Sequence, residues 1–308
     1  MKNNRFGKSV AIVTASVLSV ACLALTGCGD IVVNGRNGMS VNGVYNVQYD
    51  EAKYNVGDVE YSGEVKRINI DWIDGNVDIT YHDEDSIVVK ETYDGKGDDS
   101  AKMRTSFENG ALDVRYCSRA CMIPAMNKSL SVVLPKGTTL ELFGYDATSA
   151  KLKFDEITTG DFEYDATSGT LDCDMIKASG EISIDVTSGN ITVEKALCAS
   201  SLEFDSTSGE LRVNGAEIDE DVSIDSTSGN STIVFAKMCN VAHNSTSGNL
   251  KLTVPSDSGF VVSHDATSGK TDVTVPMIID DDKYVVGDGT YTVVSDTTSG
   301  DVVIDAML

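Results

Sequence analysis

The sequence repeats one short phrase, Asp-x-Thr-Ser-Gly with small departures, eight times between residue 146 and residue 300. Successive copies are separated by 19, 20, 20, 20, 19, 21 and 31 residues, measured between Thr148, Thr167, Thr187, Thr207, Thr227, Thr246, Thr267 and Thr298. A unit this short cannot enclose a core alone and must bury its apolar side against its neighbours. The repeat therefore predicts one coil of a solenoid.

The residues on both sides of the phrase indicate which kind of solenoid. Apolar and polar residues alternate through 182–193 and again through 202–213, which is the period of a β-strand, and no comparable stretch has helical spacing. Strand crossovers strongly favour one hand. We therefore predict an all-β fold, a single-stranded right-handed parallel β-helix or β-solenoid with about 20 residues per coil.

Stacking would turn each repeat position into a column of side chains spaced at roughly 4.8 Å. The main predicted inner column contains Tyr145, Tyr164, Ile184, Phe204, Ile224, His243, His264 and Ser295. The structural turn residues are predicted to be Asp165, Gly169, Asp185, Gly189, Asp205, Gly209, Asp225 and Gly229. In this interpretation each Asp accepts hydrogen bonds from the N–H groups of its turn, and each Gly supplies a positive φ.

Three columns also allow a functional interpretation. Stacked Asp carboxylates repel each other, so the column could bind Ca²⁺, although the glycine-rich nonapeptide of calcium-loaded β-rolls is missing. The Thr column could contact a glycan, or it could hold the corners together through hydrogen bonds. His243 and His264 would be adjacent, and interior packing is the favoured role for both. We predict no catalytic residue, no metal ligand and no cofactor site, with Ca²⁺ as the one alternative.

The N-terminus has the layout of a bacterial lipoprotein signal peptide over residues 1–27. Lys2, Arg5 and Lys8 precede an apolar run over 10–25, which is short for a membrane span. The run ends in Leu-Thr-Gly-Cys28, which resembles a lipobox, and Cys28 is then the lipidated first residue of the mature protein. Acyl chains such as palmitate on Cys28 would anchor the protein to the membrane.

The remaining chain divides into three parts. Residues 28–60 lack a clear period and predict a flexible tether. Residues 61–145 predict irregular N-terminal coils, because 68–79 can be superimposed on the repeat, and Trp72 is expected to plug the open end. Residues 146–308 form the regular repeat, with an inserted hairpin or flap near 276–290 that turns at Asp281–Asp282.

Composition excludes several partners. The chain has 48 acidic and 24 basic residues and a net charge of −24, so nucleic acid is excluded as a partner and phosphate or uronate clamps are scarce. Cys173, Cys198 and Cys239 are expected to be free, buried thiols, and the pairing of Cys117 with Cys121 stays open. No Cys or His spacing resembles a zinc site.

The lipobox, the segment Ile-Asp-Trp-Ile-Asp-Gly-Asn-Val at 70–77, the strand at 130–135 and the Thr-Ser-Gly coils together resemble the bacterial putative-adhesin family of domain-of-unknown-function β-strand-repeat proteins. The resemblance covers nearly all of the chain beyond residue 60. It implies a β-solenoid in the cell envelope, often on lipoproteins of Gram-positive bacteria.

Together these observations predict an acidic, extracytoplasmic protein, lipid-anchored to the cell membrane at the Gram-positive cell surface, with no enzymatic activity. The solenoid is expected to serve adhesion, or interaction with an unknown envelope protein or glycan. An envelope-stress or signalling accessory that binds a membrane partner is the alternative. A β-helix enzyme acting on polysaccharides is the third hypothesis, disfavoured by the short corners over 146–270.

Overall fold

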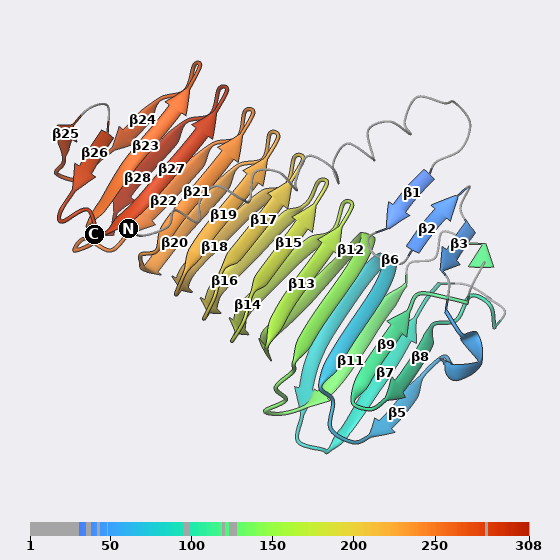
Figure 1. Cartoon of the computed structure of the whole chain (residues 1–308). Coiled ribbons are helices and arrows are strands. Elements are labelled where there is room, and N and C mark those ends of the chain that lie inside the picture. Colours follow the sequence, from blue (N-terminus) through green and yellow to red (C-terminus); the bar gives the residue numbers. More distant parts are fainter. Residues whose placement is uncertain are drawn as a thin grey trace, which may run out of the picture.

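The computed structural model describes residues 31–34, 38–41, 44–47, 49–94, 99–118, 121–122, 128–280 and 283–307. The expected signal peptide, Cys28 and the Asp281–Asp282 turn lie outside these residues. The described part forms an elongated rack of strands with the coils side by side along one axis (Figure 1). This arrangement is the predicted all-β solenoid.

Each regular coil consists of two strands joined at the Thr-Ser-Gly corner. The first strands are β13 (Asp161–Ala166), β15 (Ile182–Val186), β17 (Leu202–Ser206), β19 (Asp221–Ser226), β21 (Asn240–Ser245), β23 (Phe260–Ala266) and β27 (Tyr291–Thr297). The second strands are β14 (Thr170–Ala178), β16 (Asn190–Cys198), β18 (Glu210–Ile218), β20 (Ser231–Lys237), β22 (Leu250–Val254), β24 (Thr271–Val273) and β28 (Val302–Ala306). Two longer strands, β6 (Arg67–His82) and β12 (Leu142–Thr159), run through both sides of a coil.

Neighbouring coils pair in parallel and in register. Ile184 lies opposite Tyr164 on one side and Phe204 on the other. The same register places Asp185 between Asp165 and Asp205. Inward residues are buried, with Ile184 and Phe204 at 1% and 0% exposure, so the predicted inner column is the core over these coils.

The order of coils at the C-terminal end differs from the order in the sequence. β27 lies between β21 and β23, and β28 lies between β22 and β24. The coil of residues 291–306 is therefore inserted between two earlier coils. The predicted hairpin makes this possible: β25 (Ile278–Asp280) and β26 (Lys283–Val286) pair antiparallel, and β26 pairs with β23 and turns the chain back.

The N-terminal end shows a similar departure. β6 pairs in register with β12, but the strands that follow β6 lie on its other side. These are β9 (Ala111–Arg115) and β11 (Ser129–Pro135), and they form a coil outside the β6 coil. The antiparallel strands β4 (Asn55–Val56), β5 (Val59–Ser62), β7 (Ser86–Thr92) and β8 (Arg104–Glu108) cover this end.

Trp72 is buried one coil inside the end and does not plug it. Its side chain is fully buried and meets Tyr116 edge to face, with 4.9 Å between the ring centroids. The expectation was wrong because the coil of β9 and β11 lies beyond β6 and covers the indole. Covering this end is the role of the antiparallel strands.

The predicted tether contains ordered backbone over most of its length. β1 (Ile31–Asn34), β2 (Gly38–Val41) and β3 (Val44–Val47) form a small sheet with β10 (Cys121–Met122). A short 3₁₀ helix, η1 (Glu51–Lys53), follows, and β4 and β5 join the large sheet. For the described residues between 31 and 60 the expectation of a flexible tether over 28–60 is therefore wrong, because strand pairing, part of it with distant segments, supplies order that local periodicity did not reveal.

We expect Ile184→Asp to unfold the regular coils. The substitution places an unpaired charge in the centre of the column and should lower the free energy of unfolding by about 4 kcal/mol or more. Urea unfolding followed by circular dichroism measures the loss. Thr187→Asp, at an exposed corner position of the same coil, is the control. If both variants unfold like the parent, residue 184 does not face the core.

Candidate functional site

The corners form a continuous ridge that is held by bonds between coils. The N–H groups of Thr187 and Ser188 donate to the carbonyls of Ala166 and Thr167 in the preceding coil, at 3.0 and 2.8 Å. The corners at 207–208 and 227–228 repeat this pattern. These Thr and Ser N–H groups are therefore not capped by the Asp of their own coil, and for them the predicted role of Asp185, Asp205 and Asp225 is wrong.

The repeat glycines are needed because neighbouring backbones approach closely. None of Gly169, Gly189, Gly209 and Gly229 is among the described glycines with positive φ, so the predicted reason for glycine at these corners is also wrong. A Cβ built on Gly189 would lie 2.1 Å from the carbonyl oxygen of Gly169, and one on Gly229 would lie 2.0 Å from that of Gly209. Glycine thus leaves room for the next coil.

We expect Gly229→Ala to destabilise the protein by about 3 kcal/mol, because the new methyl group must push two corners apart. Gly215→Ala is the control, since its Cβ would lie 3.3 Å from the nearest atom, the Glu194 carbonyl oxygen. Chemical denaturation of both variants measures the difference. Equal stability of the two would show that the corners can separate without cost.

The Asp column is an acidic ladder. Partial burial, followed by repulsion from Asp225 and Asp185, raises the pKa of Asp205 to about 6. Burial also raises the pKa of Asp185. Within the described ranges no group of three or more His, Cys, Asp or Glu side chains converges to hold a metal ion.

The hydroxyl groups of the ridge divide into two sets. The Ser hydroxyls point along the stack, as when Ser208 Oγ donates to the Thr187 carbonyl at 3.4 Å and Ser228 Oγ to that of Thr207 at 3.3 Å. The adjacent Thr side chains at 187, 207 and 227 are exposed. Ser thus supports the corners, whereas Thr faces solvent.

The histidine column is interrupted by Ser295. Because the coil of 291–306 is inserted, Ser295 lies opposite both His243 and His264, and the expectation that the two histidines are adjacent is wrong. His243 Nδ1 and Ser295 Oγ are 2.9 Å apart, and both residues are buried. His264 contacts the hydroxyls of Thr271 and Thr297 at 2.8 and 3.0 Å. The serine is enclosed in the core, out of reach of a substrate.

Burial, with a smaller contribution from His264, lowers the pKa of His243 to about 4. The unfolded chain, with an ordinary His pKa near 6.5, then binds the proton first as the pH falls. Stability from this group is complete above about pH 6.5 and is lost towards pH 4, a change of about 3 kcal/mol. Asp205 has the opposite effect on stability: because its pKa is raised in the folded state, it favours the folded state more as the pH falls.

We therefore expect His243→Gln to reduce the loss of stability between pH 7.5 and pH 4.5, measured by urea unfolding at both values. Gln keeps a partner for Ser295 but does not titrate. Thr207→Gln, at an exposed corner position that carries no titratable group, should retain the pH dependence of the parent. If His243→Gln follows the parent curve, the imidazole does not control the acid response.

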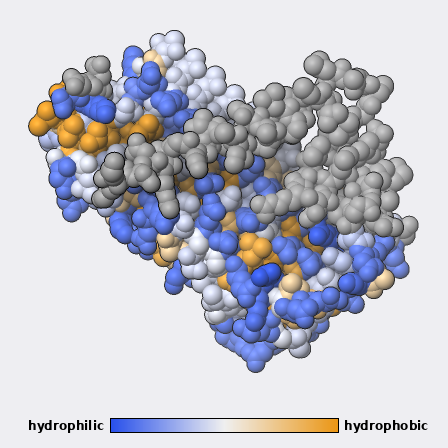
Figure 2. All heavy atoms as spheres, in the orientation of Figure 1, coloured by the Kyte–Doolittle hydropathy of each residue, from blue (hydrophilic) through white to orange (hydrophobic). Residues whose placement is uncertain are grey.

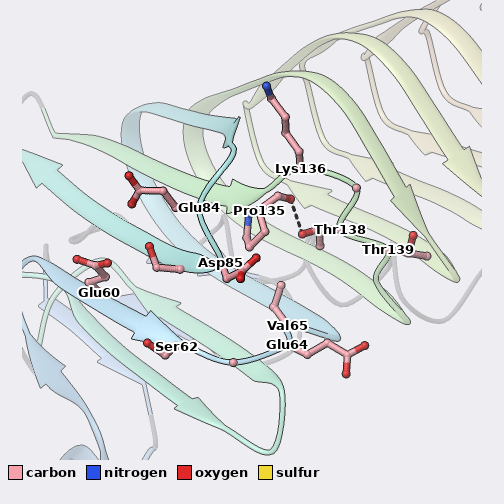
Figure 3. Close-up of a pocket in the computed structure, with 13 residues that line it drawn as sticks. Glu60, Ser62, Glu64, Val65, Glu84, Asp85, Pro135, Lys136, Thr138 and Thr139 are labelled. Carbon is pink, nitrogen blue, oxygen red and sulfur yellow. Dashed lines mark hydrogen bonds between the residues drawn. The ribbon is translucent and has the colours of Figure 1, made fainter.

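An acidic groove of about 830 Å³ lies at the N-terminal end (Figure 3). Its walls come from β5 and the segment after it, from the β6–β7 turn and from the β11–β12 turn. Four exposed carboxylates line it, those of Glu60, Glu64, Glu84 and Asp85. The one lysine of the lining, Lys136, is 2.8 Å from Asp83.

The C-terminal hairpin carries an apolar area (Figure 2). Ile278 and Ile279 are 71% and 65% exposed, and Met277, which precedes them, is also exposed. β25 pairs with β26 on one side, and no other described strand pairs with it. An unpaired strand edge with exposed isoleucines is a surface that other chains can extend. The sequence indicated the flap but not this exposure.

The buried cysteines do not contribute to the candidate surfaces. Cys173, Cys198 and Cys239 are free and buried as predicted, and Cys117 is also buried. In the part of the chain that the structure covers, no helix is long and apolar enough to cross a bilayer.

Comparison with known proteins agrees with this architecture. A family model described as Toastrack DUF4097 matches residues 65–306. The chain belongs to this family. The toastrack match begins just before β6 and ends with β28, so it covers the whole stack of coils.

Two solved structures illustrate the likeness of this toastrack protein to others. One, described as a "putative adhesin" from Bacteroides fragilis, is 12% identical with a TM-score of 0.48, and the match covers 81% of this chain and 97% of that one. Another "putative adhesin", from Parabacteroides distasonis, is 13% identical with a TM-score of 0.36, and the same shares are covered. A search of curated proteins found no match.

Proposed function

We propose that this toastrack protein is a non-catalytic surface module, lipid-anchored through Cys28 on the outer side of the cell membrane, that binds a protein partner at the flap end of its rack. The anchor is supported by the charged and apolar N-terminal segments and the lipobox. We propose the adhesive role because two solved structures that are similar to this chain are described as a "putative adhesin".

The exposed edge of β25 is the observation that carries the proposal. The chain is strongly acidic, yet two consecutive isoleucines are exposed on a strand that, among the described residues, pairs only with β26. A partner that adds a strand to β25 would satisfy its free N–H and C=O groups and cover both side chains. Backbone pairing combined with apolar contact favours a protein over a glycan.

The Thr ridge supports a second candidate, contact with a glycan. The exposed hydroxyls at 187, 207 and 227 follow the coil spacing, whereas the Ser hydroxyls beside them are used within the stack. The accessory hypothesis differs from adhesion only in its partner, which would be a membrane protein of the producing cell. Identification of the bound molecule distinguishes these possibilities.

We expect a photoreactive residue at position 278 to capture a discrete protein on intact producing cells or on cells to which they attach. The same probe at Thr207 or Lys270 should capture little. Ile279→Lys should abolish capture from position 278, whereas Thr207→Lys, an equal change of charge on the ridge, should not.

Recovery of an envelope membrane protein would favour the accessory role, and recovery of a protein from another cell would favour adhesion. If the probe at Thr207 captures glycans and the probe at position 278 captures no protein, the binding surface is the ridge of corners and not the flap.

A further inference from the structure

A buried pair of opposite charges lies under the N-terminal end of the rack. Glu91 is in β7, and Lys128 directly precedes β11, the strand beside β7. Lys128 Nζ is 2.6 Å from Glu91 Oε2, and the two side chains are 0% and 4% exposed. Neither group belongs to the surfaces proposed for binding.

The lysine nitrogen is held from several sides. It donates to the carbonyl of Ala101 at 2.7 Å and to the carbonyl of Tyr116. The rings of Trp72, Tyr93 and Tyr116 surround it, with centroids 5.3, 5.6 and 4.5 Å away. Beside these two carbonyls, the nitrogen also contacts the Glu91 carboxyl group, with which it forms an ion pair. Two N–H bonds are thus directed at carbonyls while the nitrogen lies against the carboxyl group.

The other oxygen of Glu91 is polarised by the backbone. The N–H of Met103 donates to Oε1 at 2.9 Å. A donor at this position stabilises negative charge that develops on the oxygen when a nucleophile adds to the carboxyl carbon. The carboxyl group therefore has a nitrogen at one oxygen and an N–H donor at the other.

One proton transfer within the pair would produce two groups that can react with each other. Charged groups removed from water lose their hydration, and transfer of one proton from Lys128 to Glu91 gives an uncharged amine beside a carboxylic acid. These are the two reactants of amide formation, and the surrounding rings leave little space for water.

We propose that Glu91 and Lys128 condense to an intramolecular amide that staples β7 to β11. The Nζ lone pair attacks Cδ of the protonated carboxyl group, and the Met103 N–H stabilises the charge on Oε1. A second proton passes from Nζ to Oε2, the Cδ–Oε2 bond breaks, and water leaves. Ammonium and carboxylate become one amide and one water, so no oxidant, reductant or further reactant is needed.

The staple would close a loop between residues 91 and 128 that includes β8, β9 and β10. β7 is an antiparallel strand of the covering end, and β11 is part of the outermost coil, so the amide would fix the cover to the stack. Pulling on the chain could then separate these strands only by breaking a covalent bond.

The test is peptide mapping by mass spectrometry of the full chain, purified, denatured and digested. We expect a branched peptide that contains Glu91 and Lys128 and is lighter by one water, about 18 Da, than the sum of its two arms. Fragmentation must place the link on these two residues. Succinimides at Asp-Gly sites lose the same mass but stay within one peptide and reopen in mild base, whereas the amide persists.

Two controls accompany the measurement. Lys128→Arg should give only unbranched peptides, because a guanidinium does not act as the nucleophile. The exposed pair Lys151 and Asp172, 3.3 Å apart, should remain unlinked in the parent protein. Recovery of residues 91 and 128 from the parent only on separate, full-mass peptides would overturn the proposal and leave a simple buried ion pair.

Discussion

Parallel pairing between equivalent residues of neighbouring coils is the constraint on which the rest of this structure depends. Once Asp185 lies opposite Asp165 and Asp205, every other residue of the coil is also placed above its counterpart. Apolar positions then form continuous core columns. Acidic positions are brought together too, so repulsion between stacked carboxylates adds to the effect of burial in raising the pKa of Asp205. The corner glycines follow from it as well, since stacked corners leave no room for a Cβ.

The sequence was sufficient to predict the fold within a coil, because strand alternation and the spacing of the phrase determine which side chains point inward. It was not sufficient to predict which coil adjoins which. Ser295 separates His243 from His264 although it follows both in the chain, and β9 and β11 lie beyond β6 although they follow it. Coil order depends on where a hairpin or long insertion sends the chain, which a repeat pattern does not encode.

Of the candidate surfaces, the flap was foreseen and its exposed isoleucines were not, because exposure depends on the strand order at that end. The sequence gives a weaker indication of the buried pair of Glu91 and Lys128. Glu91 occupies the inward phase of the alternation Ile87, Val89, Glu91, and a charged residue at an inward position requires a partner. That partner is 37 residues away, from 91 to 128, and no periodicity connects the two.

The inserted coil also bears on how the molecule can reach its final form. Coils up to residue 254 can add one after another as a growing edge, but the coil of 260–273 stacks on the coil of 291–306 and not on the coil of 240–254. Residues 291–306 are the ones that pair with β21 and β22. An intermediate that lacks residues 291–306 would leave the edges of β21 and β22 open, and an open edge is a template for a foreign strand. Protection of this edge therefore depends on the last residues of the repeat, which leave the ribosome after the coil that they separate from the stack.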